Sequence, residues 1–143
     1  MEDLSLHVLD IAENSIAAGA DRIRIHVERD EVEGTLSIRI EDNGRGMDRR
    51  TLEACRDPFF STKPGKRVGL GIPLLAQAAR ESGGSFHISS APGEGTRIRA
   101  VFSLAHPDLK PLGDMDQTVY VLRMTHPEIS IEYTTRMEDR PGG

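Results

Sequence analysis

The stretch Glu41–Met47, with the sequence EDNGRGM, follows directly on a run in which apolar and polar residues alternate. Leu36, Ile38 and Ile40 take every second position of that run, which predicts a β-strand with one buried face. Asp42 continues the same alternation, so its carboxylate is expected on the core-facing side. A carboxylate there needs a hydrogen-bond donor, because burial without one carries a large desolvation cost. The NGRG that follows predicts a loop.

Regular patterns on both sides of this stretch predict one α/β domain. Apolar residues at helical spacing predict helices over 4–18 and 70–82, with a short helix over 48–54. Strict alternation predicts strands over 22–28, 36–42, 86–90 and 97–104. Two further strands are expected over 118–123 and 128–133, as a hairpin about Thr125–Pro127. We expect residues 1–106 to form the ligand-binding domain and 107–143 to form a C-terminal extension, the hairpin with a frayed end.

Composition excludes several classes of function. The chain of 143 residues carries a net charge of −5, with its Lys and Arg scattered, so tight binding to a nucleic-acid backbone is not expected. No apolar run approaches the roughly 20 residues that span a bilayer, and the start of the chain lacks the pattern of a secretory signal. Cys55 is the single cysteine, which fits a cytoplasmic location.

Asp42 is placed to recognise adenine. A fixed carboxylate accepts a hydrogen bond from the exocyclic amino group of adenine and repels the carbonyl oxygen that guanine presents at that position. Gly44 and Gly46 are expected to let the backbone pass close to a flat base, and Met47 to complete that wall of the pocket. Thr96 begins the core-facing side of another strand, so its hydroxyl is expected to meet Asp42. Taken alone, the loop is equally consistent with an ordinary tight turn.

Polar residues on the first helix suggest a metal and a water site. Asp10 and Asn14 are four residues apart and lie on one helical face. The amide oxygen of Asn14 is a suitable ligand for Mg²⁺, and Asp10 can position or deprotonate a water molecule. A solvent-facing polar stripe is the simpler explanation for the same pattern.

A third group of residues suggests a phosphate site. Gly69, Leu70 and Gly71 open the second long helix, whose N–H groups and dipole favour a phosphate. Lys63 lies on the preceding loop, where it can add positive charge, although such a loop is often merely solvated.

The four segments, in this order, resemble the ATP-binding superfamily of gyrase, Hsp90, histidine kinases and the mismatch-repair ATPases. Residues 10–14 are similar to its N box, and its three glycine motifs are matched by 42–46, 69–71 and 93–96. The resemblance implies a two-layer α/β sandwich of the Bergerat type, with a mixed sheet packed on helices. It also implies that Asn14 holds Mg²⁺ and that Asp42, supported by Thr96, binds the adenine of ATP.

The resemblance leaves the reaction open. Asp10 stands where hydrolysing members carry a glutamate. The first helix begins almost at Met1, so we expect a stand-alone module without the phospho-acceptor helix of a histidine kinase. We therefore expect a Mg·ATP-binding protein with slow hydrolysis or a nucleotide-dependent switch. The alternatives are a protein kinase acting in trans on a partner, as anti-sigma-factor kinases do, and a partner-binding module ordered by nucleotide.

Overall fold

The structure is a computed structural model, and it describes residues 3–54 and 71–138. Its helices are α1 (Leu4–Ala17), α2 (Arg49–Ala54), α3 (Gly71–Glu81) and α4 (Met115–Thr125). Its strands are β1 (Arg22–Asp30), β2 (Thr35–Asp42), β3 (Ser85–Ser90), β4 (Thr96–Ser103) and β5 (Ser130–Glu138). The elements expected between residues 4 and 104 are therefore present, with ends that differ by one or two residues.

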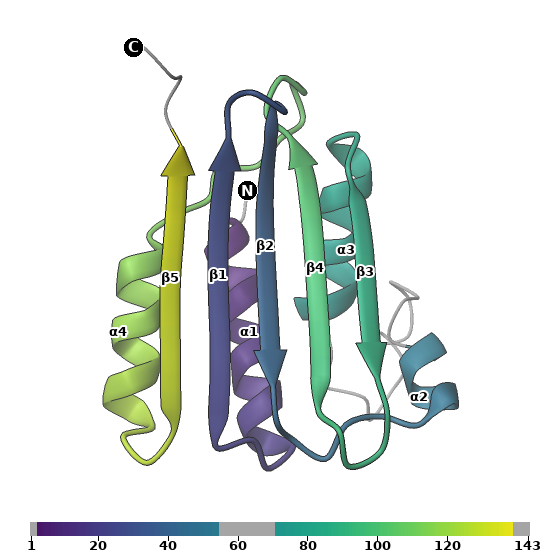
Figure 1. Ribbon diagram of the computed structural model, residues 1–143, viewed down its shortest axis with the longest axis vertical. Coiled ribbons are helices and arrows are strands. Elements are labelled where there is room, and N and C mark those ends of the chain that lie inside the picture. Colours follow the sequence, from purple (N-terminus) through teal and green to yellow (C-terminus); the bar gives the residue numbers. More distant parts are fainter. Residues whose placement is uncertain (1–2, 55–70, 139–143) are drawn as a thin grey trace.

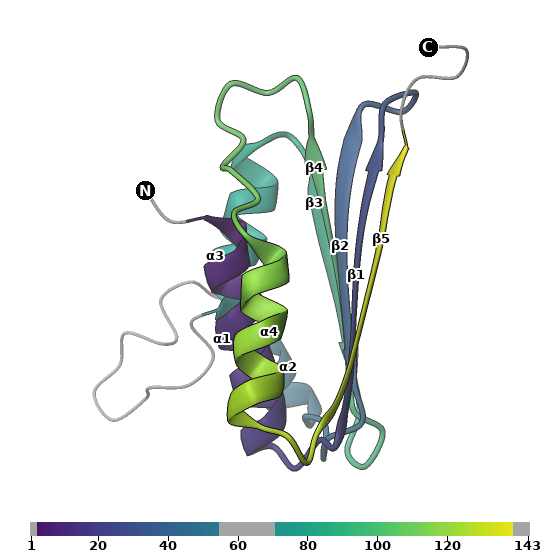
Figure 2. The ribbon, with the colours of Figure 1, turned by 90° about the vertical axis from the view of Figure 1, so that its left-hand side faces the viewer.

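The strands form one mixed sheet in the order β3-β4-β2-β1-β5 (Figure 1). The first four strands pair antiparallel with their neighbours, whereas β5 pairs parallel to β1. Figure 2 shows α1, α3 and α4 together on one face of this sheet. The expected two-layer α/β sandwich with a mixed sheet is thus confirmed.

Alternation along the strands places the core between the two layers. In β1 the buried side chains are Ile23, Ile25 and Val27, and in β2 they are Leu36, Ile38 and Ile40. Apolar residues at helical spacing meet them from the other layer, because one stripe of each helix faces the sheet. The buried members of that stripe in α1 are Leu4, Val8, Ile11 and Ala12.

The expected C-terminal hairpin is wrong. Residues 115–125 form helix α4, and β5 then returns parallel to β1, so a helix connects β4 to β5. The buried residues of α4, which fall on one helical face, are Met115, Thr118, Val119 and Leu122. Asp114 caps the helix by accepting a hydrogen bond from the backbone N–H of Gln117 at 2.9 Å. This stripe and cap outweigh the strand preference of the β-branched and aromatic residues within 118–121.

In the described parts of the chain, no helix is both long and apolar enough to cross a membrane.

The helix α4 is expected to be part of the folding unit rather than an appendage. Leu122 is fully buried and Met124, two residues later, is 63% exposed. We predict that Leu122→Ala lowers the free energy of unfolding by about 2–5 kcal/mol, because it leaves a cavity in the core. The matched Met124→Ala should change it by less than about 0.5 kcal/mol. Chemical denaturation of both variants measures this, and equal effects would contradict the packing.

Candidate functional site

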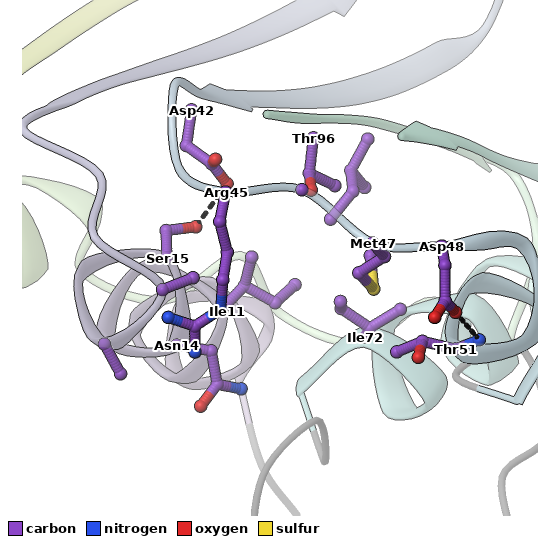
Figure 3. Close-up of a pocket in the computed structure, with 14 residues that line it drawn as sticks. Ile11, Asn14, Ser15, Asp42, Arg45, Met47, Asp48, Thr51, Ile72 and Thr96 are labelled. Carbon is purple, nitrogen blue, oxygen red and sulfur yellow. Dashed lines mark hydrogen bonds between the residues drawn. The ribbon is translucent and has the colours of Figure 1, made fainter. Parts of the chain in front are cut away.

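A cavity of about 370 Å³ opens between the C-terminal half of α1, the loop after β2 and the start of α3 (Figure 3). This volume lies within the range of small-molecule sites. The residues that line it are Ile11, Asn14, Ser15, Ala17, Ala18, Asp42, Arg45, Gly46, Met47, Asp48, Thr51, Ile72, Thr96 and Ile98. Five residues expected from the sequence to bind the ligand therefore lie in one cavity, namely Asn14, Asp42, Gly46, Met47 and Thr96.

Asp42 lines the cavity, and both of its carboxylate oxygens accept hydrogen bonds from the protein. Its Oδ2 accepts a hydrogen bond from the hydroxyl of Ser15 at 2.6 Å, and its Oδ1 accepts one from the N–H of Gly44 at 2.8 Å. These are the donors that a core-facing carboxylate requires, and they come from α1 and from the loop. Each carboxylate oxygen has more than one lone pair, so Asp42 can still accept from a ligand while its orientation stays fixed.

The loop after β2 is tied to the end of α1 through Asn43. The side-chain oxygen of Asn43 accepts hydrogen bonds from the N–H groups of Asp21 and Arg22, each at 3.0 Å. Its amide nitrogen donates to the carboxylate of Asp21 at 2.7 Å. The N–H of Arg45 donates to the carbonyl of Ala18 at 3.0 Å. The segment that carries Asp42 is thereby fixed against the helix that carries Asn14.

The two glycines of this loop allow close packing of the protein backbone. A Cβ on Gly46, whose φ is +73°, would lie 2.0 Å from the carbonyl oxygen of Ala91. A Cβ on Gly44 would lie 3.1 Å from the carbonyl oxygen of Ala18, and Gly44 does not line the cavity. The missing side chains therefore let the protein backbone pack on itself. Gly46 borders the cavity as well, whereas Gly44 only positions its neighbours.

Ser90 at the end of β3 joins the third glycine motif to the loop. Its hydroxyl oxygen accepts from the N–H of Met47 at 2.8 Å and lies 3.0 Å from the hydroxyl of Thr96. The same hydroxyl donates to the carbonyl of Gly95 at 2.7 Å. Thr96 is the direct cross-strand partner of Asp42 in the β2–β4 register, as the strand phases predict. Ser90 was not expected in the site, and only the alternation of β3 could have suggested it.

The other residues expected at the site are more dispersed. Asn14 lines the cavity, whereas Asp10, one turn earlier on α1, is exposed and is not part of the lining. Gly71 also lies outside the lining. A Cβ on Gly71 would be 2.8 Å from the carbonyl oxygen of His7 and 2.9 Å from the Cβ of Asp10. Gly71 thus allows the start of α3 to pack against the turn of α1 that carries Asp10. Lys63, Gly69 and Leu70 lie outside the described residues.

Comparison with known proteins gives the family. Residues 2–106 match the family described as histidine kinase-, DNA gyrase B- and HSP90-like ATPase. The chain belongs to this family. Among its relatives, the signal transduction histidine-protein kinase AtoS of Escherichia coli is 34% identical over 113 residues, and the sensor protein kinase FleS of Pseudomonas aeruginosa is 37% identical over 97. These alignments cover 78% and 68% of this chain but 17% and 24% of the relatives, so the chain spans less than a quarter of the length of either kinase.

A solved structure of the same fold is the MutL ATPase domain of Aquifex aeolicus complexed with ADP. It superposes with a TM-score of 0.59 at 14% identity and covers 95% of this chain and 60% of the MutL chain. At this identity the likeness shows the fold alone. The superposed share of the chain is larger than the part matched by the ATPase family, residues 2–106.

Several lining residues of this ATPase-family domain were not expected from the sequence. One of them is Ile72, whose apolar side chain lies beside that of the expected Met47 (Figure 3). Arg45 extends from the loop towards α1, where Asn14 lies (Figure 3). Asp48 precedes α2 and accepts a hydrogen bond from the N–H of Thr51 at 2.8 Å. An aspartate three residues ahead of a threonine N–H at a helix start is a recognisable capping pattern.

The Asp48 cap predicts a pH effect at the mouth of the cavity. The backbone and side chain of Thr51 hold the pKa of the Asp48 carboxyl below its ordinary value of 3.8. A group whose pKa is lowered by folding stabilises the folded state above the unfolded pKa, and this contribution is lost as the pH falls through the folded pKa. We predict that an NMR titration of Asp48 gives a midpoint below 3.8 and that the Thr51 amide shift follows the same curve. A midpoint at or above 3.8 would contradict the cap.

Proposed function

We propose that the chain binds Mg·ATP in this cavity, with the adenine at Asp42 and the phosphates towards Asn14 and the start of α3. The observation that carries the proposal is the orientation of Asp42. Its carboxylate enters an otherwise largely apolar cavity, and Thr96 lies opposite it on the neighbouring strand. Ile98, Met47 and Ile72 offer flat apolar surfaces for a base. Membership of the ATPase family supports the same ligand.

The residues at the other end fit a metal that is held mainly by the nucleotide. In the described ranges, no three side chains of the His, Cys, Asp and Glu types gather to form a metal site. Mg²⁺ commonly keeps water ligands and is held by one or two protein oxygens together with phosphates. The amide oxygen of Asn14 is the protein ligand that we propose, and bound Mg²⁺ would neutralise charge on the phosphates. Arg45 adds a positive charge on the same side of the cavity.

The adenine part of the proposal is tested by Asp42→Asn. Asp42 and Glu41 are adjacent carboxylates on opposite faces of β2, so Glu41→Gln is a matched control. We predict that Asp42→Asn weakens ATP binding by roughly tenfold to a hundredfold, which corresponds to the free energy of one hydrogen bond to a charged group. Its preference for ATP over GTP should fall as well, while Glu41→Gln binds as the parent does. Calorimetric titration measures both, and thermal unfolding checks that the variants fold. Unchanged ATP affinity in Asp42→Asn would refute this pocket.

Hydrolysis is the reaction that we propose, with Asp10 orienting and deprotonating the attacking water. Asp10 is exposed on the helical face that leads to Asn14, and it lies against the start of α3 at Gly71. It is thus accessible to a water molecule at the outer end of a nucleotide whose base reaches Asp42. A carboxylate in this place acts as a general base.

We predict that Asp10→Asn lowers the rate of phosphate release by roughly a hundredfold or more, the usual contribution of a general base, and leaves the Kd for ATP within about twofold. Glu13→Gln on the same helix is the control, since Glu13 instead pairs with His126 at 2.9 Å. Release of inorganic phosphate from γ-labelled ATP measures the rate. Equal turnover in Asp10→Asn and the parent would rule out a role of Asp10 as the general base.

Phosphorylation of a partner protein is the second candidate. It is favoured by the higher identity to sensor kinases, 34% and 37%, than to the MutL domain at 14%. In that case the γ-phosphate label would be transferred to a second protein rather than released, and the same assay distinguishes the two outcomes.

A further inference from the structure

The outer face of the sheet is charged and, in the part of the chain that the structure describes, uncovered by helices (Figure 2). Its side chains are the ones that alternate with the buried residues of each strand. The strand registers arrange them in rows that run across the sheet. One row holds Arg97, Glu41, Arg24 and Glu132, with the two signs in alternation. In such a row each charged side chain has a cross-strand neighbour of opposite sign, and such pairs stabilise the sheet.

The next row lacks this balance. It consists of His87 on β3, Arg99 on β4, Arg39 on β2 and His26 on β1, each the direct cross-strand partner of the next. We call these four residues the arginine row. It ends at the neutral Thr134 on β5 and contains no acidic residue.

Arg39 and Arg99 are the unusual pair in the arginine row. They lie directly opposite each other, and no carboxylate of the described residues is within 4.0 Å of either guanidinium. Two neighbouring cations on this face do have a carboxylate partner, because Arg24 lies 3.5 Å from Glu132, and His26 of the same row lies 3.1 Å from Glu28. Like charges directly opposite each other destabilise a sheet. Two exposed guanidinium groups in this arrangement offer a doubled, planar donor set for carboxylate or phosphate oxygens.

The surroundings of the arginine row decide between the possible anions. A hollow of about 250 Å³ adjoins it, lined by Arg24, Ile25, His26, Arg39, Glu41, Glu132 and Thr134. The hollow thus carries carboxylates beside the cations. A nucleic acid presents a continuous line of phosphates, which the flanking Glu41 and Glu132 would repel. A protein surface can instead place a short acidic segment on the arginine row and basic residues beside the glutamates.

We propose that the arginine row is a docking site for a partner protein, which binds it through a short Asp- or Glu-rich segment flanked by basic residues. The site is separate from the cavity, although it lies on the reverse side of the same two strands. Asp42 and Thr96 face the helices, whereas Arg39 and Arg99 face outwards. The proposal therefore does not depend on the nucleotide.

The test uses the full chain and a fluorescein-labelled synthetic peptide with a central block of Asp and Glu flanked by Lys. We expect Arg39→Gln combined with Arg99→Gln to weaken peptide binding by roughly tenfold or more. The matched control combines Arg29→Gln and Arg80→Gln, which removes the same charge from exposed sites outside the row. The control should bind within about twofold of the parent. Fluorescence anisotropy at low and physiological salt measures all three proteins.

Two further measurements make the outcome decisive. Arg39→Gln alone should raise the melting temperature at low salt, with the difference disappearing at high salt, because it relieves the repulsion from Arg99. A labelled single-stranded RNA of equal charge should bind more weakly than the peptide. The proposal is overturned if the parent does not bind the peptide, if the control loses as much affinity as the double variant, or if the RNA binds more tightly through the same arginines.

Discussion

The site depends on close contact between backbones at one end of the sheet. A Cβ on Gly46 would lie 2.0 Å from the carbonyl oxygen of Ala91, and one on Gly95 would lie 2.0 Å from that of Asp42. Both glycines have a positive φ. No larger residue meets these requirements together, so the loop after β2 and the β3–β4 turn are held against each other. The contact positions the backbone at Asp42, whose carboxylate Ser15 and Gly44 then orient.

The side chains that face the cavity could largely be predicted, because they follow the alternation of residues along each strand. The alternation that buries Ile38 and Ile40 also places Asp42 inwards, and the structure supplies the donors that this position demands. Thr96 obeys the same rule on β4. Position along a strand was therefore enough to identify two side chains that line the same cavity from neighbouring strands, without knowledge of the sheet order.

The sequence was less informative about secondary structure where one segment fits both a strand pattern and a helix pattern. The residues at 118–121 have the side chains of a strand, yet Met115, Val119 and Leu122 also form a helical stripe. The helical pattern decides the structure only because the sheet edge and α1 cover this apolar stripe, and most helical stability comes from such packing. These contacts cannot be seen in the sequence. The parallel pairing of β5 with β1 could not be predicted either, because it also depends on contacts between distant segments. The glycine contacts with Ala18 and Ala91 depend on segments far apart in the chain.

The Ser90 hydroxyl, which meets Met47, Gly95 and Thr96, belongs with these hidden features, because the alternation of β3 indicates its face but not its partners, which come from two other segments. The sequence thus located the residues that face a ligand more readily than those that support them. Supporting groups act through tertiary contact, and they determine how precisely the facing groups are held.

The register of β2 also constrains how this chain can change over evolution. Successive residues of the strand serve opposite faces, with Glu41 outside and Asp42 inside. Loss or gain of one residue between Thr35 and Asp42 would exchange these faces and turn the carboxylate of Asp42 out to solvent. The turn at Gly34, at the far end of the strand, has no such constraint on its length. Length variation among homologues is therefore expected to concentrate there, while β2 keeps a constant number of residues.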